Sequence, residues 1–272
     1  MPSPSDEDEP EDPSSFISKE DNYFIPKSFD VIGEVAYLHS MPTDDPEKGG
    51  SAIMKKNKSN LEGTERAPGD EGLVTIAGAH RNPLITTHTE YGIKCVVDLN
   101  HTFFTPRMAK ERLRICQLVA RGEGVLVLFA GAGMEAFQIA GRTEASSVVT
   151  IELNEIAVQC SHRAHRMLER NNAVKCDGAA DRLKIMKGDV MVVLTGKLMG
   201  SKFDCILAPR PKEGAMDGDL GSGDGGQKFL ETILPHLKDG ECHWYDFVAD
   251  HEFPACLRSC DQYRFQSILP IN

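Results

Sequence analysis

Two glycines and an acid near the middle of the chain have the types and the spacing of a nucleotide-binding site. The apolar run at residues 125–129 stops at a turn from Gly131 to Gly133, and Glu152 ends a second apolar run 19 residues later. Glycines let backbone N–H groups approach a ligand closely, and an acid at the end of the next strand can hold both hydroxyls of a ribose. The third glycine of the dinucleotide fingerprint is absent. This shorter form favours S-adenosylmethionine, which has no pyrophosphate, over a nicotinamide or a purely structural turn.

Histidines and cysteines offer a weaker case for a metal site. His162 and His165 lie close to Cys160, on a polar helical stretch that lacks a fourth ligand at zinc spacing. The sequence therefore predicts no metal. Other cysteines lie in apolar patterns and are predicted to be reduced core residues: Cys95, Cys116, Cys205 and Cys242.

The elements that would position the glycine-rich turn alternate between strand and helix, as in a doubly wound parallel sheet. The predicted strands are 125–129, 148–153, 183–187, 203–207 and 241–247, with a sixth at 264–269. The predicted helices are 106–120, 134–140, 155–171, 227–237 and 253–259. The pattern thus predicts an α/β fold with a Rossmann-like doubly wound sheet.

The region before Pro106 is predicted to be a small β-rich domain. Residues 29–39 form one strand pattern with a central glycine, and residues 84–89 and 93–98 form a hairpin. Residues 42–72 are rich in Gly, Lys, Asp, Glu, Ser and Pro, and we expect a flexible insertion there. The predicted division is a disordered acidic tail, the N-terminal domain and a cofactor-binding domain, at residues 1–22, 23–105 and 106–272.

The net charge of −11 is concentrated at one end of the chain. Residues 1–22 carry eight acids and one lysine, a charge of −7, so the remainder carries −4, which is −11 minus −7. Local basic clusters remain, and the acidity does not exclude an RNA partner. The tail resembles neither a signal nor a transit peptide, and no apolar run reaches membrane length. We therefore expect a cytoplasmic protein without a membrane partner, with the nucleus and the mitochondrion as alternatives.

Three separated segments carry a resemblance to a known family. They are IPKSFDVIGEVAYL (residues 25–38), FFTPRMAKERLRI (residues 103–115) and a set made of FAGAG, IELN, GDV and HWYDF. Together they resemble the archaeal and eukaryotic type of tRNA guanosine-37 N(1)-methyltransferase, a family of class I methyltransferases. The resemblance runs from about residue 25 to 265. Its middle segment is the most specific, because a generic methyltransferase does not require it.

The resemblance places the chemistry on the middle segment. Glu111 takes the position of the family's proposed general base, which removes the proton from N(1) of guanine. Arg107 and Arg112 resemble motif arginines that hold phosphate or stabilise charge on the guanine O6. With Lys110 and Arg114 they form the predicted RNA-binding set, and Arg107 is also predicted to be catalytic. Spacing alone would instead make Arg107, Glu111 and Arg114 a surface ion-pair ladder.

The resemblance also implies a set of cofactor-binding residues. Glu152 resembles the ribose-binding acid, and Asp189 resembles the acid that accepts a hydrogen bond from the adenine amino group. Either acid is also of a type that caps helices. The complete predicted set is Phe103, Phe129, Gly131, Gly133, Glu152, Asn154, Asp189 and Ala208.

The chain departs from the family pattern in several places. Ala208 stands where an asparagine would contact the target base, and Arg210 is the candidate replacement. Glu135 and Ala136 are expected to lengthen the glycine-rich turn by two residues. The chain stops at Asn272 where family members continue into a hairpin, so we expect a C-terminally shortened member.

The leading functional prediction is a monomer that transfers a methyl group from S-adenosylmethionine to N(1) of guanosine 37, beside the anticodon of tRNA. The N-terminal domain would help to position the tRNA. Two alternatives stay open. The wybutosine-pathway aminocarboxypropyltransferase is favoured by Glu152 in place of aspartate and by the missing asparagine. A catalytically silent cofactor- and RNA-binding protein is favoured by Ala208 and by the early C-terminus.

Overall fold

The computed structural model describes residues 29–38, 64–65, 78–170, 174, 176–209, 229, 231–238, 243–246 and 264–267. The chain divides into two compact units, Met1–Asn82 and Pro83–Asn272. This division lies N-terminal of residue 105, where the sequence predicts the domain boundary. The predicted tail and the predicted helix 253–259 lie outside the described residues, as does the predicted insertion 42–72 apart from one short strand.

The smaller unit contains a three-stranded sheet in the order β1-β2-β3, formed by β1 (Phe29–Ile32), β2 (Val35–Leu38) and β3 (Thr64–Glu65). The prediction of a single strand over residues 29–39 is wrong, because β1 and β2 are antiparallel and pair from Phe29 with Leu38 to Ile32 with Val35. Gly33 has a φ of 60°. A glycine at the first position of a two-residue loop reverses the chain in a tight hairpin, so this residue is a turn instead of a strand centre.

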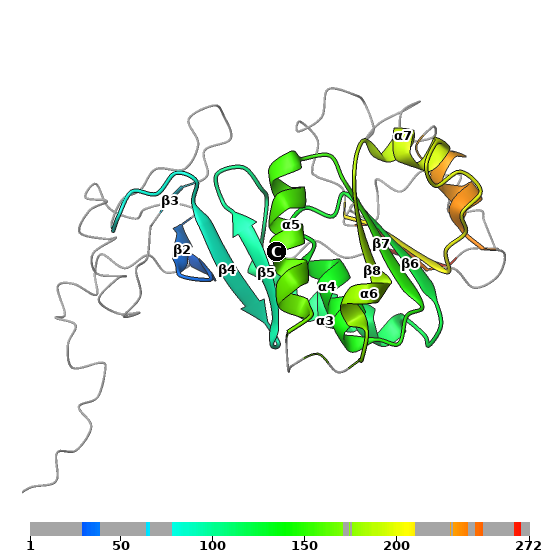
Figure 1. The fold of residues 1–272 in the computed structure, drawn as a ribbon, viewed down its shortest axis with the longest axis horizontal. Coiled ribbons are helices and arrows are strands. Elements are labelled where there is room, and N and C mark those ends of the chain that lie inside the picture. The colour runs from blue at the N-terminus through cyan, green and yellow to red at the C-terminus, as the bar shows by residue number, and fades with distance from the viewer. Residues whose placement is uncertain are drawn as a thin grey trace, which may run out of the picture. The chain divides into compact units, whose positions relative to one another are not determined.

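A second hairpin opens the larger unit and confirms the prediction for residues 84–98. Strands β4 (Ile85–Glu90) and β5 (Ile93–Asp98) are antiparallel. Tyr91 and Gly92, between them, have φ angles of 49° and 86°. Two consecutive positive φ angles define the turn whose twist matches that of the flanking strands. The hairpin packs through β5 against α4 (Met134–Arg142) and α5 (Glu155–Leu168), as Figure 1 shows for α5.

Among the described residues, the main sheet of the larger unit has six strands in the order β11-β10-β9-β6-β7-β8, and every neighbouring pair is parallel. This confirms the predicted α/β fold class. The chain leaves the central strand β6 toward β7 and β8 and then returns to β9 on the other side. Such a reversal opens a crevice beyond the carboxyl ends of the strands. The strands are β6 (Gly124–Leu128), β7 (Ser147–Glu152), β8 (Leu183–Lys187), β9 (Cys205–Ala208), β10 (His243–Asp246) and β11 (Arg264–Ser267).

The helices agree with most predictions. The predicted helix 106–120 is present as a 3₁₀ turn, η2 (Pro106–Met108), followed by α3 (Ala109–Leu118). Helix α4 begins directly after Gly133, so the expected two-residue extension of the glycine-rich turn is wrong: Glu135 and Ala136 are helical. Three short elements complete the described set: α6 (Ala179–Arg182), α7 (Val190–Thr195) and η3 (Leu234–His236). The sequence did not predict α6 or α7.

The core surrounds strand β6, all of whose residues are buried. On one face, Leu126 and Ile206 pack with α7 and with Phe229 and Ile233. Of the predicted core cysteines, three are buried free thiols, Cys95, Cys116 and Cys205, and Cys242 lies outside the described residues. No helix in the described part of the chain is long and apolar enough to cross a membrane.

Candidate active site

The glycine-rich turn and the end of β7 are joined by the carboxylate of Glu152. The N–H of Gly131 donates to Glu152 Oε2 at 2.7 Å, and the N–H of Asn154 donates to Oε1 at 2.7 Å. The N–H of Ala130 donates to Ile151 O at 3.1 Å, which holds the turn beside β7. A carboxylate oxygen can accept more than one hydrogen bond, so half-buried Glu152 retains acceptor capacity for ligand hydroxyls.

The two glycines of the turn differ in the space beside them. Gly131 has a φ of 52°, and a Cβ built there would meet Phe103 O at 3.7 Å and no closer atom. Gly133 has a φ of 81°, and a Cβ there would lie 3.0 Å from a ring carbon of Phe137 and 3.1 Å from Ser161 Oγ. Gly131 therefore leaves room for close approach to the backbone, whereas Gly133 permits tight packing where α4 begins.

Asn154 links the end of β7 to the loop that precedes η2. Its Oδ1 accepts hydrogen bonds from the N–H groups of Ile156 at 2.9 Å and Ala157 at 3.3 Å, which caps α5. Its Nδ2 donates to His101 O at 2.7 Å. The side chain predicted to contact the cofactor is thus a helix cap that tethers a loop. Phe103, further along that loop, is 66% exposed.

Asp189 lies next to this arrangement and Ala208 does not line it. The N–H of Gly188 donates to Glu152 O at 3.0 Å, which brings the following residue, Asp189, beside the end of β7. Asp189 Oδ1 accepts from the N–H of Val192 at 3.0 Å and caps α7. The methyl group of Ala208 is fully buried in the core.

Phe129 directly follows β6 and has a left-handed backbone conformation, with a φ of 51°. Its partly buried ring lies 5.8 Å from that of Phe229, measured between centroids. The aromatic ring is thus held in the hydrophobic core beside the glycine-rich turn.

The predicted chemical segment forms η2 and α3. Thr105 Oγ1 accepts from the N–H of Arg107 at 3.3 Å and caps the first turn. Nε of Arg114 donates to both carboxylate oxygens of Glu111, at 2.8 and 2.9 Å. The spacing of this segment suggests a ladder of surface ion pairs, and the structure contains its Glu111–Arg114 pair. The side chain of Glu111 is 20% exposed, and Arg107 and Lys110 are exposed.

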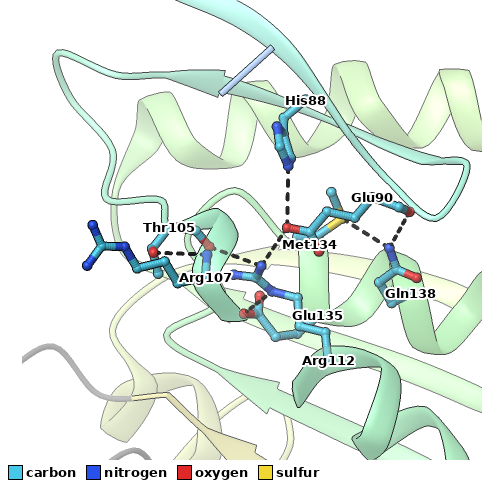
Figure 2. A network of polar contacts seen from close by, with 8 residues as sticks. All are labelled: His88, Glu90, Thr105, Arg107, Arg112, Met134, Glu135 and Gln138. Atoms are coloured by element: carbon cyan, nitrogen blue, oxygen red, sulfur yellow. Dashed lines mark hydrogen bonds and ion pairs between the residues drawn. The ribbon is translucent and has the colours of Figure 1, made fainter. Parts of the chain in front are cut away.

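Arg112 differs from the other basic residues of this segment because it is buried. Its Nε donates to Glu135 Oε1 at 2.8 Å, and its Nη1 donates to Glu90 Oε1 at 2.7 Å and to Thr105 O at 3.1 Å (Figure 2). Its side chain is 4% exposed. The guanidinium is therefore not available to RNA phosphate in this structure, which corrects the predicted contact.

The charge of Arg112 is maintained despite its burial. Burial lowers the pKa of a guanidinium, but the carboxylates of Glu135 and Glu90 outweigh this effect and raise the pKa of Arg112. The ring of Phe104 also lies below the guanidinium, 5.1 Å from its carbon to the ring centroid. Glu90 and Glu135 were not predicted to be partners of Arg112. A signal exists, because Arg112 shares a helix face with buried Ile115 and Cys116, and a charge on an apolar face requires a buried partner.

The structure thus brings together Gly131, Glu152, Asn154 and Asp189 at the carboxyl edge of the sheet, and the loop that carries Phe103 adjoins them. The η2–α3 segment is connected to α4 through Arg112. Among the described residues, no group of three or more His, Cys, Asp or Glu side chains could hold a metal ion.

Comparison with known proteins gives consistent matches. Residues 86–216 match the family described as the TRM5/TYW2 methyltransferase domain. The chain is 30% identical over 248 residues to the tRNA (guanine(37)-N(1))-methyltransferase Trm5b of Pyrococcus abyssi, with 85% of this chain and 63% of the relative covered. It is 30% identical over 139 residues, 47% of each chain, to the tRNA(Phe) (4-demethylwyosine(37)-C(7)) aminocarboxypropyltransferase of Pyrococcus horikoshii.

A solved structure shares the fold. The crystal structure of P. horikoshii TYW2 in complex with MeSAdo has a TM-score of 0.61 and 21% identity, with 91% of this chain and 81% of that chain covered. The chain spans less than two thirds of the length of the two curated relatives, 63% and 47%.

Proposed function

We propose that this chain transfers a methyl group from S-adenosylmethionine to N(1) of guanosine 37 in tRNA, because residues 86–216 match the TRM5/TYW2 methyltransferase domain. One observation carries the proposal. The segment that bears Glu111 is tied through Arg112 to α4, the helix that follows the glycine-rich turn. The segment that bears the proposed base and the turn proposed to bind the cofactor therefore belong to adjoining elements. Trm5b of Pyrococcus abyssi, whose match covers 85% of this chain, is named as a tRNA (guanine(37)-N(1))-methyltransferase.

The residues at the sheet edge fit S-adenosylmethionine. The acceptor capacity of Glu152 suits the two ribose hydroxyls, and the open space beside Gly131 suits close approach of a ligand to the backbone. Asp189 lies where an acid can accept from the adenine amino group. When bound, the cofactor supplies a methyl group on a positively charged sulfur, which is an electrophile.

Glu111 is the proposed general base. N(1) of guanine carries a proton, and its removal by a carboxylate leaves a lone pair that can attack the methyl carbon. The bonds from Arg114 Nε to both oxygens orient the carboxylate of Glu111. Exposed Arg107 and Lys110, on the same segment, would contact the phosphates or the charge that develops on guanine O6.

A second candidate is aminocarboxypropyl transfer from the same cofactor. The similarity to the P. horikoshii aminocarboxypropyltransferase, 30% over 139 residues, favours it. Ala208 in place of an asparagine also favours it, because its buried methyl group offers no polar contact to a guanine. The two reactions differ in which carbon leaves the sulfur, so isotopic labelling separates them.

The test uses S-adenosylmethionine labelled either in the methyl group or in the aminocarboxypropyl chain. The acceptors are tRNA with guanosine at position 37, tRNA with adenosine there, and tRNA with 4-demethylwyosine there. We expect methyl label only in the guanosine tRNA. Glu111→Gln should lower the rate by about 10² to 10⁴-fold, because general-base catalysis contributes that much. Glu144→Gln makes the same chemical change at an exposed carboxylate, which pairs with Arg121, and should keep full activity.

The other outcomes are equally clear. Aminocarboxypropyl label in the 4-demethylwyosine tRNA, without methyl label in any acceptor, would establish the second candidate. Absence of both labels in all three acceptors, with cofactor binding intact by calorimetry, would overturn both enzymatic proposals.

A further inference from the structure

Arg112 is the centre of a buried cluster that the proposed chemistry does not use. Its guanidinium donates in three directions, to Glu135 on α4, to Glu90 at the end of β4 and to the carbonyl of Thr105 before η2. The side chains of Glu90 and Glu135 are 3% and 12% exposed. Figure 2 shows Arg107, two residues beyond Thr105, pointing away from this cluster. One side chain thus contacts three separate parts of the chain from a fourth, α3.

The composition of the cluster does not favour stability. Two carboxylates face one guanidinium, and within the described residues Glu90 Oε2 is buried without a hydrogen-bond partner. His88 Nε2 lies 3.5 Å from the other oxygen of Glu90. Buried ion clusters are often no more stable than apolar side chains of similar volume. A function other than stability would explain why charged groups occupy this place.

An arginine at this position fixes the directions of its hydrogen bonds. A guanidinium presents its N–H groups in a fixed planar fork, whereas a lysine ammonium is a single point charge on a flexible stem. The bond to Thr105 O fixes the turn that begins the η2–α3 segment, and the bond to Glu135 fixes the first turn of α4. Gln138, one turn later on α4, donates to Glu90 O at 2.8 Å and attaches the hairpin to the same helix.

We propose that Arg112 is a positioning residue that sets the Thr105–Arg107 turn against the first turn of α4. It thereby holds the proposed base and the phosphate-binding side chains of η2–α3 in register with the glycine-rich turn. The inference rests on the proposed function for its catalytic consequence. Its structural part is independent of the proposed function: the guanidinium of Arg112 holds the Thr105–Arg107 turn against α4.

Three variants of the full chain test this inference. Arg112→Lys keeps the charge and removes the fork. Glu135→Ala removes only the bond to α4, at a partly exposed helical position that tolerates alanine, so it should fold even where Arg112→Lys does not. Arg121→Lys is the matched control, because it changes an arginine that is 86% exposed and pairs with Glu144 at the surface.

The first readout is hydrogen exchange of the amides in residues 103–108, which needs no activity. Arg112→Lys should accelerate this exchange at least about tenfold, because the turn loses its anchor, while Arg121→Lys leaves it unchanged. Folded content is checked by circular dichroism. Exchange in folded Arg112→Lys or Glu135→Ala that stays within threefold of the wild-type rate would overturn the proposal.

The second readout is steady-state methyl transfer to guanosine-37 tRNA. Small displacements of catalytic groups reduce kcat strongly, so Arg112→Lys should lower kcat by about 10²-fold and Glu135→Ala by about tenfold, with KM for tRNA within threefold. A purely structural role would lower the folded fraction and leave kcat per folded molecule unchanged, which would overturn the proposal. If the wild-type chain transfers no methyl group, the proposed function fails and the exchange measurement alone decides the role of Arg112.

Discussion

At the scale of single residues, Gly131 and Gly133 make a matched pair for mutation. Both have positive φ angles, so alanine at either position should cost about 1 kcal/mol in backbone strain. Gly133→Ala should cost more, because its Cβ would meet Phe137 and Ser161 at 3.0 and 3.1 Å. Gly131→Ala meets no atom closer than 3.7 Å, yet its methyl group would enter the space proposed for the cofactor.

We therefore predict that urea unfolding is more sensitive to Gly133→Ala and that S-adenosylmethionine affinity is more sensitive to Gly131→Ala. Calorimetric titration of the two folded variants checks the second part. Equal affinity of Gly131→Ala and wild type would show that the ligand does not approach the backbone at Gly131.

Sequence reasoning at this scale succeeds where a contact is local. Asp189 is of a type that caps helices, and it does cap α7. The pair of Glu111 and Arg114 follows from helical spacing. The partners of Arg112 lie 22 and 23 residues away in two other elements, and no local pattern indicates which side chains meet there.

At the scale of elements, Asp204 connects the beginning of β6 to the segment after η3. Its Oδ2 accepts from the N–H of Gly124 at 2.7 Å and from Lys238 Nζ at 2.6 Å. Burial raises the pKa of this carboxyl, but the bonds from Lys238 and Gly124 outweigh burial and hold the pKa below its usual value. The ionised form is therefore the one that stabilises the fold.

We predict that Asp204→Asn lowers the free energy of unfolding by about 1–2 kcal/mol at pH 7. A depressed pKa gives stability that is fully present above the unfolded-state value, near 3.9, and is lost as the pH falls through the folded-state value. The difference between wild type and variant should thus shrink below about pH 4. Urea titrations at pH 7 and pH 3 measure it, and a difference that is the same at both values would contradict the assignment.

The strands and helices were predictable where the period of the apolar residues and the length of the segment indicate the same type of element. Strands β6 to β9 and helices α4 and α5 follow from apolar runs between turn residues. Helix α7 was not predicted because its sequence, VMVVLT, is rich in β-branched residues, which favour strands. The sequence alone does not show that Asp189 caps a helix there. The β1–β2 hairpin was missed because alternation of apolar residues continues across Gly33.

At the scale of the whole molecule, the charge distribution should govern the encounter with the proposed tRNA substrate. Residues 1–22 contribute −7 of the net charge of −11. We predict that a chain without residues 1–22 binds tRNA several-fold more tightly at low salt, because it repels the phosphate backbone less. The gain should vanish at high ionic strength, where screening removes long-range repulsion.

Filter binding of tRNA to both chains across a salt series tests this prediction. A chain of the same length in which the eight acids are replaced by Asn and Gln separates charge from length. If the neutralised chain and the wild type bind tRNA with equal affinity at low salt, the electrostatic explanation is wrong.

The position of β6 in the main sheet also affects how the protein is made. Its first neighbour, β7, follows it directly in the sequence, but the bond from Gly124 on its other edge goes to Asp204, 80 residues later. At translation rates of about 5–20 residues per second, the ribosome takes roughly 4–16 s to synthesise that interval. During this time the central strand of the nascent chain has one open edge, which is a site for misassembly with other chains. Slow codons between residues 128 and 204 would lengthen this exposure, and a chaperone that covers unpaired strands would shorten it.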